Sequence, residues 1–244
     1  MNFWPFRKKI DSLYSGGLLH NFTDWHSHIL PGVDDGIPDM QKALDVLAAY
    51  EKAGVKKVWL TPHIMEDYPN ETQKLREKFA ELQLEYDGKI ELKLAAENML
   101  DSLFEERLQN KDLLPIGDEG QHLLVETSYF SAPMNFDDII DEIMHSGYYP
   151  ILAHPERYRY MNEADYKDLK RRGVLFQTNF MSLVGMYGET ARRKAEWMLK
   201  QGMIDLTGSD IHRLSATQRY LNQSPSSNAP LDAILQVAHH PAID

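Results

Sequence analysis

The chain has 244 residues and no cysteine. Disulfide bonds, zinc–thiolate sites and any mechanism that uses a cysteine nucleophile of this chain are therefore excluded. Long apolar runs are also lacking, since none approaches the roughly 18 residues that span a bilayer. Arg7-Lys8-Lys9 is not followed by the apolar core of a signal peptide. We expect a cytoplasmic protein that does not insert into a membrane.

Positive charge is scarce, with 26 Lys and Arg against 37 Asp and Glu and a formal net charge of −11. This balance argues against a generic nucleic-acid binder, which holds phosphates mainly with Lys and Arg. It does not argue against a substrate with one acidic group that binds in a locally positive pocket, especially where carboxylates of the protein bind divalent ions. With 43% hydrophobic residues, the chain is long enough for one large core. We therefore expect a single domain over residues 1–244.

Strand-like and helix-like segments alternate about seven times, which indicates a parallel sheet. At this length a closed or nearly closed barrel is favoured over an open doubly wound sheet, and no Gly-x-Gly-x-x-Gly or P-loop pattern supports nucleotide binding. Pro38 suits a first helical turn, and Asn70 suits an N-cap. Residues 1–21 are expected as a lead-in segment, strands at 21–26, 55–60, 90–96, 123–125, 149–153, 174–178 and 203–207, helices at 38–53, 70–86, 136–145, 163–172 and 189–201, and a C-terminal loop with a short helix at 231–238 within 222–244.

The most informative stretch is residues 24–36, which contains a His-x-His pattern followed by Leu-Pro-Gly and Asp-Asp-Gly. If a strand runs through it, the two-residue period puts Asp24, His26 and His28 on one face, with two imidazoles converging on one point. The Gly-rich turn signals then end the strand and let Asp35 fold back over that point. Alone, the pattern also fits two satisfied or surface histidines, so further ligands from distant segments are needed to indicate a metal site.

Histidines and carboxylates recur where the other expected strands end. In a parallel barrel these ends open on one rim, which is where such folds place their chemistry. Asp210-Ile211-His212 repeats the spacing of the first motif near the other end of the chain. The nine candidate metal ligands are His26, His28, Asp35, His63, Glu97, Glu126, His154, Asp210 and His212.

Nine side chains exceed the about four to six ligands of a single ion, so we predict two or three ions that share carboxylates. Imidazoles and carboxylates without sulfur suit Mn²⁺, Fe or Zn²⁺ better than Ca²⁺ or Mg²⁺. Taken singly, Glu97 equally fits the cap of a helix that begins at Asn98, and Thr61-Pro62-His63 fits an ordinary turn. The joint pattern favours a metal centre.

Arginines near these residues are candidates for binding an anion. Arg157 lies three residues after His154, and a guanidinium suits bidentate phosphate binding. A surface ion pair with Glu156 or a neighbour is the alternative. Arg213 and Arg219 follow the last histidine and are further candidates. The segment from Asn179 to Gly185 follows the sixth strand and is expected either to line the pocket or to form a structural rim loop.

Together these residues resemble the polymerase-and-histidinol-phosphatase (PHP) superfamily, and within it the bacterial protein-tyrosine phosphatases that regulate capsule and exopolysaccharide synthesis. The resemblance covers roughly residues 22–215. Its parts most specific to this subgroup are Leu30-Pro31-Gly32, Asp34-Asp35-Gly36 and His154-Pro155-Glu156-Arg157-Tyr158. It is also carried by Thr61-Pro62-His63, Ala96-Glu97, Val125-Glu126, Asn179-x-x-Ser182-Leu183-x-Gly185 and Ser209-Asp210-x-His212.

The resemblance implies a distorted, TIM-like (β/α)7 barrel, known as the PHP fold. It also implies a trinuclear, typically manganese-dependent centre held by residues that match the nine candidate ligands. Arg157 matches a phosphate-contacting arginine of the family. A second family arginine follows the final Asp-x-His motif; Arg219 is nearest in kind but comes about two residues late, while Arg213 stands where Asn is often found.

These features predict metal-dependent hydrolysis of phosphotyrosine in a protein. By resemblance, the target is the C-terminal tail of an autophosphorylating bacterial tyrosine kinase that controls polysaccharide export. Tyr129, Tyr158 and Tyr160 are expected at the rim, where they would pack against the substrate's phenyl ring. The alternatives are a small-molecule phosphomonoesterase of the histidinol-phosphatase type, a PHP nuclease, which the acidic charge disfavours, and a regulatory module that binds phosphotyrosine without turnover. The oligomeric state is not indicated.

Overall fold

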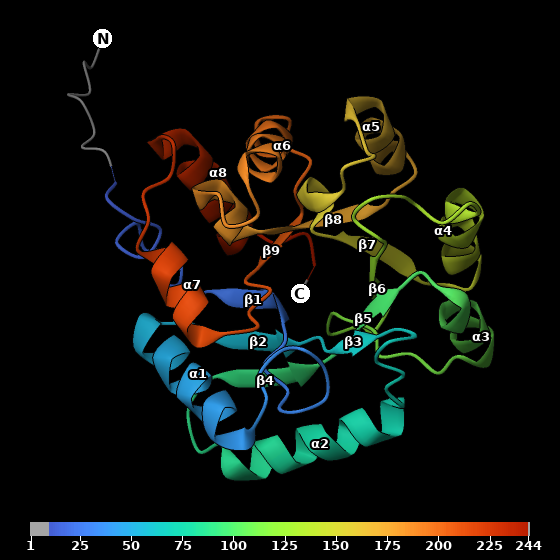
Figure 1. Ribbon diagram of the computed structural model, residues 1–244, viewed down its shortest axis with the longest axis horizontal. Coiled ribbons are helices and arrows are strands. Elements are labelled where there is room, and N and C mark those ends of the chain that lie inside the picture. The colour runs from blue at the N-terminus through green and yellow to red at the C-terminus, as the bar shows by residue number, and fades with distance from the viewer. Residues whose placement is uncertain (1–9, 244) are drawn as a thin grey trace.

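A curled parallel sheet forms the centre of the protein in the computed structural model, which describes residues 10–243 (Figure 1). The described strands pair in the orders β1-β2-β4 and β3-β5-β6-β7-β8-β9, and every pair of neighbours is parallel. The strands are β1 (Thr23–Ser27), β2 (Lys57–Leu60), β3 (His63–Ile64), β4 (Glu91–Leu94), β5 (Glu97–Met99), β6 (His122–Glu126), β7 (Tyr149–Ala153), β8 (Leu175–Asn179) and β9 (Leu206–Gly208).

Backbone hydrogen bonds join the two sheets at both of their junctions. After β9, the Asp210 N–H donates to the His26 carbonyl at 2.8 Å, and a parallel bridge joins Ser27 to Ile211. Between β2 and β3, Pro62 lacks an N–H and interrupts the strand, but its carbonyl accepts the Glu97 N–H at 3.1 Å. The sheet therefore curls around on itself in a mixed α/β fold.

Helices cover the outside of the curled sheet (Figure 1). They are amphipathic, so each buries one stripe of side chains, as α1 does with Ala43, Val46, Leu47 and Tyr50. The helices are α1 (Met40–Ala53), α2 (Thr72–Glu85), α3 (Ser102–Asn110), α4 (Phe136–His145), α5 (Glu163–Arg171), α6 (Glu189–Lys200), α7 (Leu214–Leu221) and α8 (Asn228–His239), with 3-10 turns η1 (Pro155–Arg157) and η2 (Phe180–Val184).

The strands are buried on both faces, as a parallel sheet requires. A large apolar cluster joins strand residues to the helices. A smaller cluster consists almost entirely of residues from the strands, and the Trp25 and Trp59 rings stack within it with centroids 6.0 Å apart. Among residues 10–243, none of the helices combines the length and apolar character that crossing a bilayer requires.

The alternation of strands and helices predicted from the sequence is confirmed, and α4 and β7 have the predicted bounds. Helices α3 and α7 were not predicted, because both are short, at nine and eight residues. Helix α8 begins at Asn228, so the polar loop before it covers only 222–227. Most of the remaining bounds shift by one to three residues, which is usual where helix and strand ends are inferred from side-chain pattern.

Three local predictions were wrong. Helix α1 begins after Asp39, whose carboxylate accepts the Lys42 N–H, so Pro38 lies outside the helix. Asn70 does not cap α2, because its side chain donates to the carbonyls of Val33 and His63. Glu97 does not cap a helix, since it begins β5.

The lead-in predicted at residues 1–21 lies partly outside the described residues, which exclude 1–9. Residues 10–21 form turns rather than a helix. The backbone N–H groups of Leu13 and Tyr14 donate to the carbonyls of Gln223 and Leu221. The described part of the lead-in is therefore hydrogen-bonded to the end of α7 and to the segment that follows it.

Candidate metal centre

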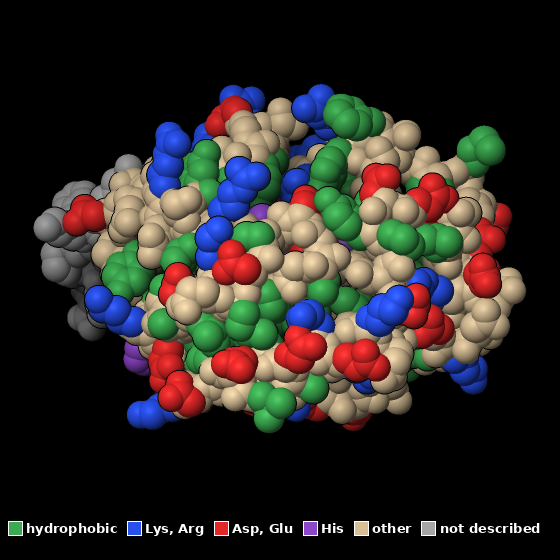
Figure 2. Space-filling model, turned by 60° about the horizontal axis from the view of Figure 1, so that its bottom comes forward, with side chains coloured by type: hydrophobic (Ala, Val, Ile, Leu, Met, Phe, Trp, Pro, Cys, Tyr) green, Lys and Arg blue, Asp and Glu red, His purple; other side chains and the backbone are tan. Residues whose placement is uncertain are grey.

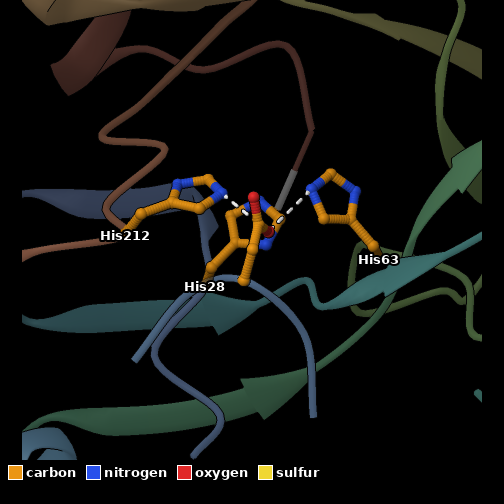
Figure 3. A group of neighbouring side chains, drawn as sticks. His28, His63 and His212 are labelled. Atoms are coloured by element: carbon orange, nitrogen blue, oxygen red, sulfur yellow. Dashed lines mark ion pairs between the residues drawn. The ribbon is translucent and has the colours of Figure 1, made fainter. Parts of the chain in front are cut away.

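All nine candidate ligands lie together at the carboxyl ends of the strands. Because parallel strands end at the same edge, residues from β1 to the turn after β9 meet there. Figure 3 shows the side chains of His28, His63 and His212 pointing toward one another. Ligand atoms within 4.8 Å of one another form four overlapping groups: His28–Asp35–His63–His212, His26–His28–Asp210, His26–Glu97–His154 and His63–Glu97–Glu126.

The two histidines of the first motif face each other through their Nε2 atoms, which lie 3.1 Å apart. Nδ1 of His26 lies 2.8 Å from Oε1 of Gln177, and Nδ1 of His28 lies 2.8 Å from Oδ2 of Asp34. Since both oxygens only accept, each Nδ1 carries a proton, and each Nε2 presents a lone pair whenever its ring is neutral. Two opposed lone pairs at this distance need a cation or a proton between them.

Other buried atoms of the cluster lack hydrogen-bond partners within the described residues. They are Nδ1 of His63, Oε2 of Glu97 and Nδ1 of His154. Nδ1 of His63 lies 3.1 Å both from Oε2 of Glu97 and from Oε1 of Glu126, without the geometry of a hydrogen bond. Buried donors and acceptors are normally paired, so this arrangement fits ligands that a divalent ion would satisfy.

Two of the candidate ligands have backbone conformations that L-residues rarely adopt. The φ angle is 33° at His154 and 52° at Asp210, both in the left-handed region. Such conformations cost of the order of 1–3 kcal/mol and persist only where the surroundings fix them. His154 directly follows β7 and Asp210 lies two residues after β9, and both side chains belong to the cluster.

The charges of the cluster favour cations. Burial raises the pKa of Glu97, but His26 and His63 outweigh it and hold that pKa well below its usual range. The pKa of Asp210 is likewise raised by burial and held well below its usual range by His26, His28 and Arg157. A hydrogen bond with His212 lowers the pKa of Asp35 to about 2. Glu97, Asp210 and Asp35 are therefore ionised at neutral pH and attract positive charge.

Arg157 is bonded to one of the candidate ligands. Its Nη1 donates to Oδ2 of Asp210 at 2.7 Å, while Oδ1 of Asp210 faces Nε2 of His28 at 3.4 Å. The alternative of a surface ion pair with Glu156 is wrong, since the Glu156 carboxylate is buried and accepts from Ser182 Oγ and the Asn179 N–H. Asn179 also donates to Oδ2 of Asp210 at 2.7 Å, so the segment it begins contacts the cluster.

The other two arginines lie in different places. Arg213 lines a pocket of about 680 Å³ between the first turns of α1 and α7, together with Asp35 and His212. Arg219 is exposed in the last turn of α7 over the Tyr220 ring, and it does not line this pocket. On the face of the molecule that Figure 2 shows, small patches of histidine surface lie near the middle, beside Lys and Arg side chains.

The aromatic residues predicted for the rim differ in position. Tyr158 is fully buried, and its hydroxyl accepts the Thr127 N–H, so its predicted contact with a substrate ring is wrong. The Tyr160 hydroxyl lies 2.6 Å from Oγ1 of Thr127, while Tyr129 packs against Arg157. Tyr187 was not predicted from the sequence, yet its ring also packs against this guanidinium. Its position between Gly185 and Gly188 was the available signal.

Comparisons with known proteins agree with this arrangement. The family model for capsular polysaccharide synthesis, CpsB/CapC, matches residues 22–227. A putative tyrosine-protein phosphatase CapC from Staphylococcus aureus is 29% identical over 207 residues, covering 82% of this chain and 81% of that protein. The tyrosine-protein phosphatase CpsB from Streptococcus pneumoniae is 27% identical over 214 residues, covering 82% and 87%.

A solved structure shares the fold. It comes from a study of YwqE from Bacillus subtilis and CpsB from Streptococcus pneumoniae, described there as unique metal-dependent tyrosine phosphatases. It matches with a TM-score of 0.73 and 23% identity, covering 91% of this chain and 96% of that chain. The family match spans most of the present chain, including all nine candidate ligands. The chain belongs to the CpsB/CapC family of capsular polysaccharide synthesis proteins.

Proposed function

We propose that this chain is a metal-dependent protein-tyrosine phosphatase. The observation that carries the proposal is the cluster of nine nitrogen and oxygen ligands with Arg157 bonded to one of them. An anion placed on bound cations beside a guanidinium is the arrangement that phosphate-ester hydrolysis needs. The names of the relatives, which are tyrosine-protein phosphatases, support the choice of substrate.

The nine residues are proposed as ligands of two or three ions. Support comes from the overlap of the four groups, in which His26, His28, His63 and Glu97 each occur twice. Shared ligands allow neighbouring ions to lie close together. The nitrogen and oxygen donors favour Mn²⁺, with Fe or Zn²⁺ as alternatives.

When bound, the ions supply positive charge to the phosphoryl oxygens and acidify the attacking water. Arg157 would donate to the equatorial oxygens and stabilise the charge that develops on them in the transition state. The leaving phenolate has an ordinary pKa near 10, so it needs less protonation than an alkyl alcohol does. No covalent phosphoenzyme is required. A second arginine, Arg219 as predicted from the sequence or Arg213 beside His212, is proposed to assist.

We also propose a number of β–α units and a domain organisation for this fold. We count seven β–α units, with β2 and β3 as one strand interrupted at Pro62 and β4 and β5 as another. The element order supports this distorted (β/α)7 barrel. The hydrogen bonds from the lead-in to residues after α7 support a single domain over 1–244.

The proposed substrate is a tyrosine-phosphorylated protein, specifically the C-terminal tail of an autophosphorylating bacterial kinase that controls capsule or exopolysaccharide synthesis. Membership of a capsular polysaccharide synthesis family supports this context. The phosphatase would meet such a tail in the cytoplasm, at the inner face of the membrane.

The test compares kcat/KM for phosphotyrosine peptides, phosphoserine peptides and histidinol phosphate at equal Mn²⁺. We expect phosphotyrosine to be preferred over each of the others by about tenfold or more. A preference of that size for histidinol phosphate, or no discrimination between phosphotyrosine and phosphoserine, would assign the chain to the small-molecule phosphatases. Tight binding of phosphotyrosine without turnover would instead indicate a regulatory binding module.

A further inference from the structure

Two tyrosine rings enclose the Arg157 guanidinium. Its central carbon lies 4.3 Å from the centroid of the Tyr129 ring and 4.3 Å from that of the Tyr187 ring. A cation over an aromatic face is attracted by the ring quadrupole, more strongly where water is excluded. Two aromatic rings therefore pack against the same guanidinium.

Tyr187 also reaches the carboxylate that binds this arginine. Its hydroxyl donates to Oδ2 of Asp210 at 3.3 Å, and the same oxygen accepts from Arg157 Nη1 and Asn179 Nδ2, each at 2.7 Å. Three donors thus occupy Oδ2, while Oδ1 remains directed at the histidines. Tyr187 therefore contacts both the guanidinium and the carboxylate that joins it to the candidate metal ligands.

Tyr187 lies in a turn between two glycines, and this turn determines the position of its ring. Gly185 and Gly188 have φ angles of 80° and 90°, a region that favours glycine, and no neighbouring atom limits either position. The Gly188 N–H donates to the Gly185 carbonyl at 3.0 Å, which closes a turn with Tyr187 inside it. The turn links η2, which follows Asn179, to α6.

Tyr129 belongs to a different loop. It follows β6 by three residues, and its carbonyl accepts the Arg159 N–H at 2.8 Å, which joins its loop to the segment after η1. The two rings therefore come from separate loops, and the Tyr129 loop follows β6, which carries the candidate ligand Glu126. A long arginine side chain held in this way has little rotamer freedom left to lose when it binds a phosphoryl group.

We propose that Tyr187 is a positioning residue for the phosphatase reaction, which with Tyr129 holds the Arg157 guanidinium in place for the phosphoryl group. The inference rests on the proposed function, since it assigns a role within that site. Tyr187 acts through Arg157 and Asp210 rather than by touching the substrate. The ring of Tyr187 matters more than its hydroxyl, because the stacking is close whereas the bond to Asp210 is long.

The test is a double-mutant cycle in the Mn²⁺-loaded full chain. We expect Tyr187→Ala to lower kcat/KM for an aryl phosphate by about 10- to 100-fold, as misplacement of a transition-state contact does. Tyr187→Phe, which keeps the ring, should lose no more than about threefold. In an Arg157→Ala background, Tyr187→Ala should change kcat/KM by less than about threefold, because its effect requires the arginine.

Controls separate this role from a structural one. Tyr86→Phe removes a hydroxyl that bonds to Glu51 and accepts the Ile90 N–H but contacts neither Arg157 nor Asp210, and it should have no effect on kcat/KM. Tyr187→Leu keeps apolar volume without an aromatic face, and it should behave as Tyr187→Ala does even if the alanine variant folds poorly. Metal content should equal that of the wild type in every variant that is compared.

The same cycle is repeated on the Kd of inorganic phosphate, measured by calorimetry, which requires no turnover. If the wild type binds phosphate but hydrolyses no ester, the proposed function fails while the binding cycle still tests Tyr187. Equal losses from Tyr187→Ala with and without Arg157, or no loss in the wild-type background, would overturn the positioning role. A wild type that binds no phosphate would overturn both proposals.

Discussion

Nδ1 of His28 and Oδ2 of Asp34 lie 2.8 Å apart, and the same carboxylate oxygen accepts the His63 N–H at 3.0 Å. One buried carboxylate thus orients a side chain from the first motif and the backbone of a residue some thirty positions further on. Its other oxygen accepts the Gly36 N–H at 2.9 Å, which fixes the turn that carries Asp35. Asp34 therefore supports three of the candidate ligands without belonging to them.

This relationship gives the first prediction. Asp34→Ala should weaken metal affinity by about 10- to 100-fold, as the loss of a carboxylate behind a ligating histidine typically does. Metal titration of the chelator-treated protein measures the change. Asp87→Ala, at an exposed carboxylate after α2, is the matched control and should leave the affinity unchanged. Wild-type affinity in Asp34→Ala would show that the pair does not orient His28.

The second prediction concerns pH and the metal-free protein. Burial lowers the pKa of His26, but Glu97 and Asp210 outweigh it and raise the pKa to about 9 from an ordinary value of 6.5. Protonated His26 therefore stabilises the fold fully below pH 6.5, and this contribution is lost as the pH rises through 9. We expect the Tm of the metal-free protein to fall over that interval.

Mn²⁺ should remove most of that fall, because ions bind the neutral imidazoles in place of protons. At the acid end, the pKa of Asp35 is lowered from 3.8 to about 2, so its contribution persists until the pH falls through that value. Thermal unfolding as a function of pH, with and without Mn²⁺, measures the loss of stability at the alkaline and at the acid end. A metal-free Tm that rises between pH 6.5 and 9 would contradict the assigned protonation of the cluster.

Much of the site could be predicted because its residues lie at strand ends. The two-residue period of a strand and the common edge of a parallel sheet are enough to bring His26, Glu97 and His154 together. The nine candidate ligands do lie in one cluster, whereas their role as metal ligands stays a prediction. The metal content itself stays a prediction.

What could not be predicted depends on three-dimensional detail. Asp34 and Asp35 are adjacent and have the same side chain. Only the turn at Gly36 decides that Asp34 faces His28 whereas Asp35 faces His212. Tyr158 belongs to a motif beside Arg157, yet the 3-10 turn directs its ring into the core. Tyr187 lies two residues beyond the motif that ends at Gly185, and the glycine turn brings it to the arginine.

The third prediction separates the role of the metal ligands from that of Arg157, which is proposed to bind the phosphoryl group. Arg157→Ala should leave metal content near that of the wild type while lowering kcat/KM for a phosphate monoester by about 10²-fold or more. Arg157→Lys should recover only part of the loss, since a lysine lacks the planar fork. Steady-state kinetics with parallel metal analysis measures both. A kinetically silent Arg157→Ala would mean that the guanidinium serves only Asp210.

The fourth prediction identifies the second arginine. Because Arg213 lines the pocket beside His212 whereas Arg219 lies over Tyr220, we expect the single variants Arg213→Ala and Arg219→Ala to differ in kcat/KM. A loss of about tenfold or more in only one of them identifies the residue that assists Arg157. Equal, small effects in both variants would leave Arg157 without an arginine partner.

The most direct test of the metal mechanism is elemental analysis combined with turnover of a phosphotyrosine peptide by the same protein samples. We expect more than one transition-metal equivalent per chain, loss of activity on chelation and its recovery with Mn²⁺, because the ligand groups overlap as sites for neighbouring ions do. His26→Ala and Asp210→Ala should each lower turnover by orders of magnitude. Full activity in metal-free protein, or purified protein without tightly bound metal, would contradict the account.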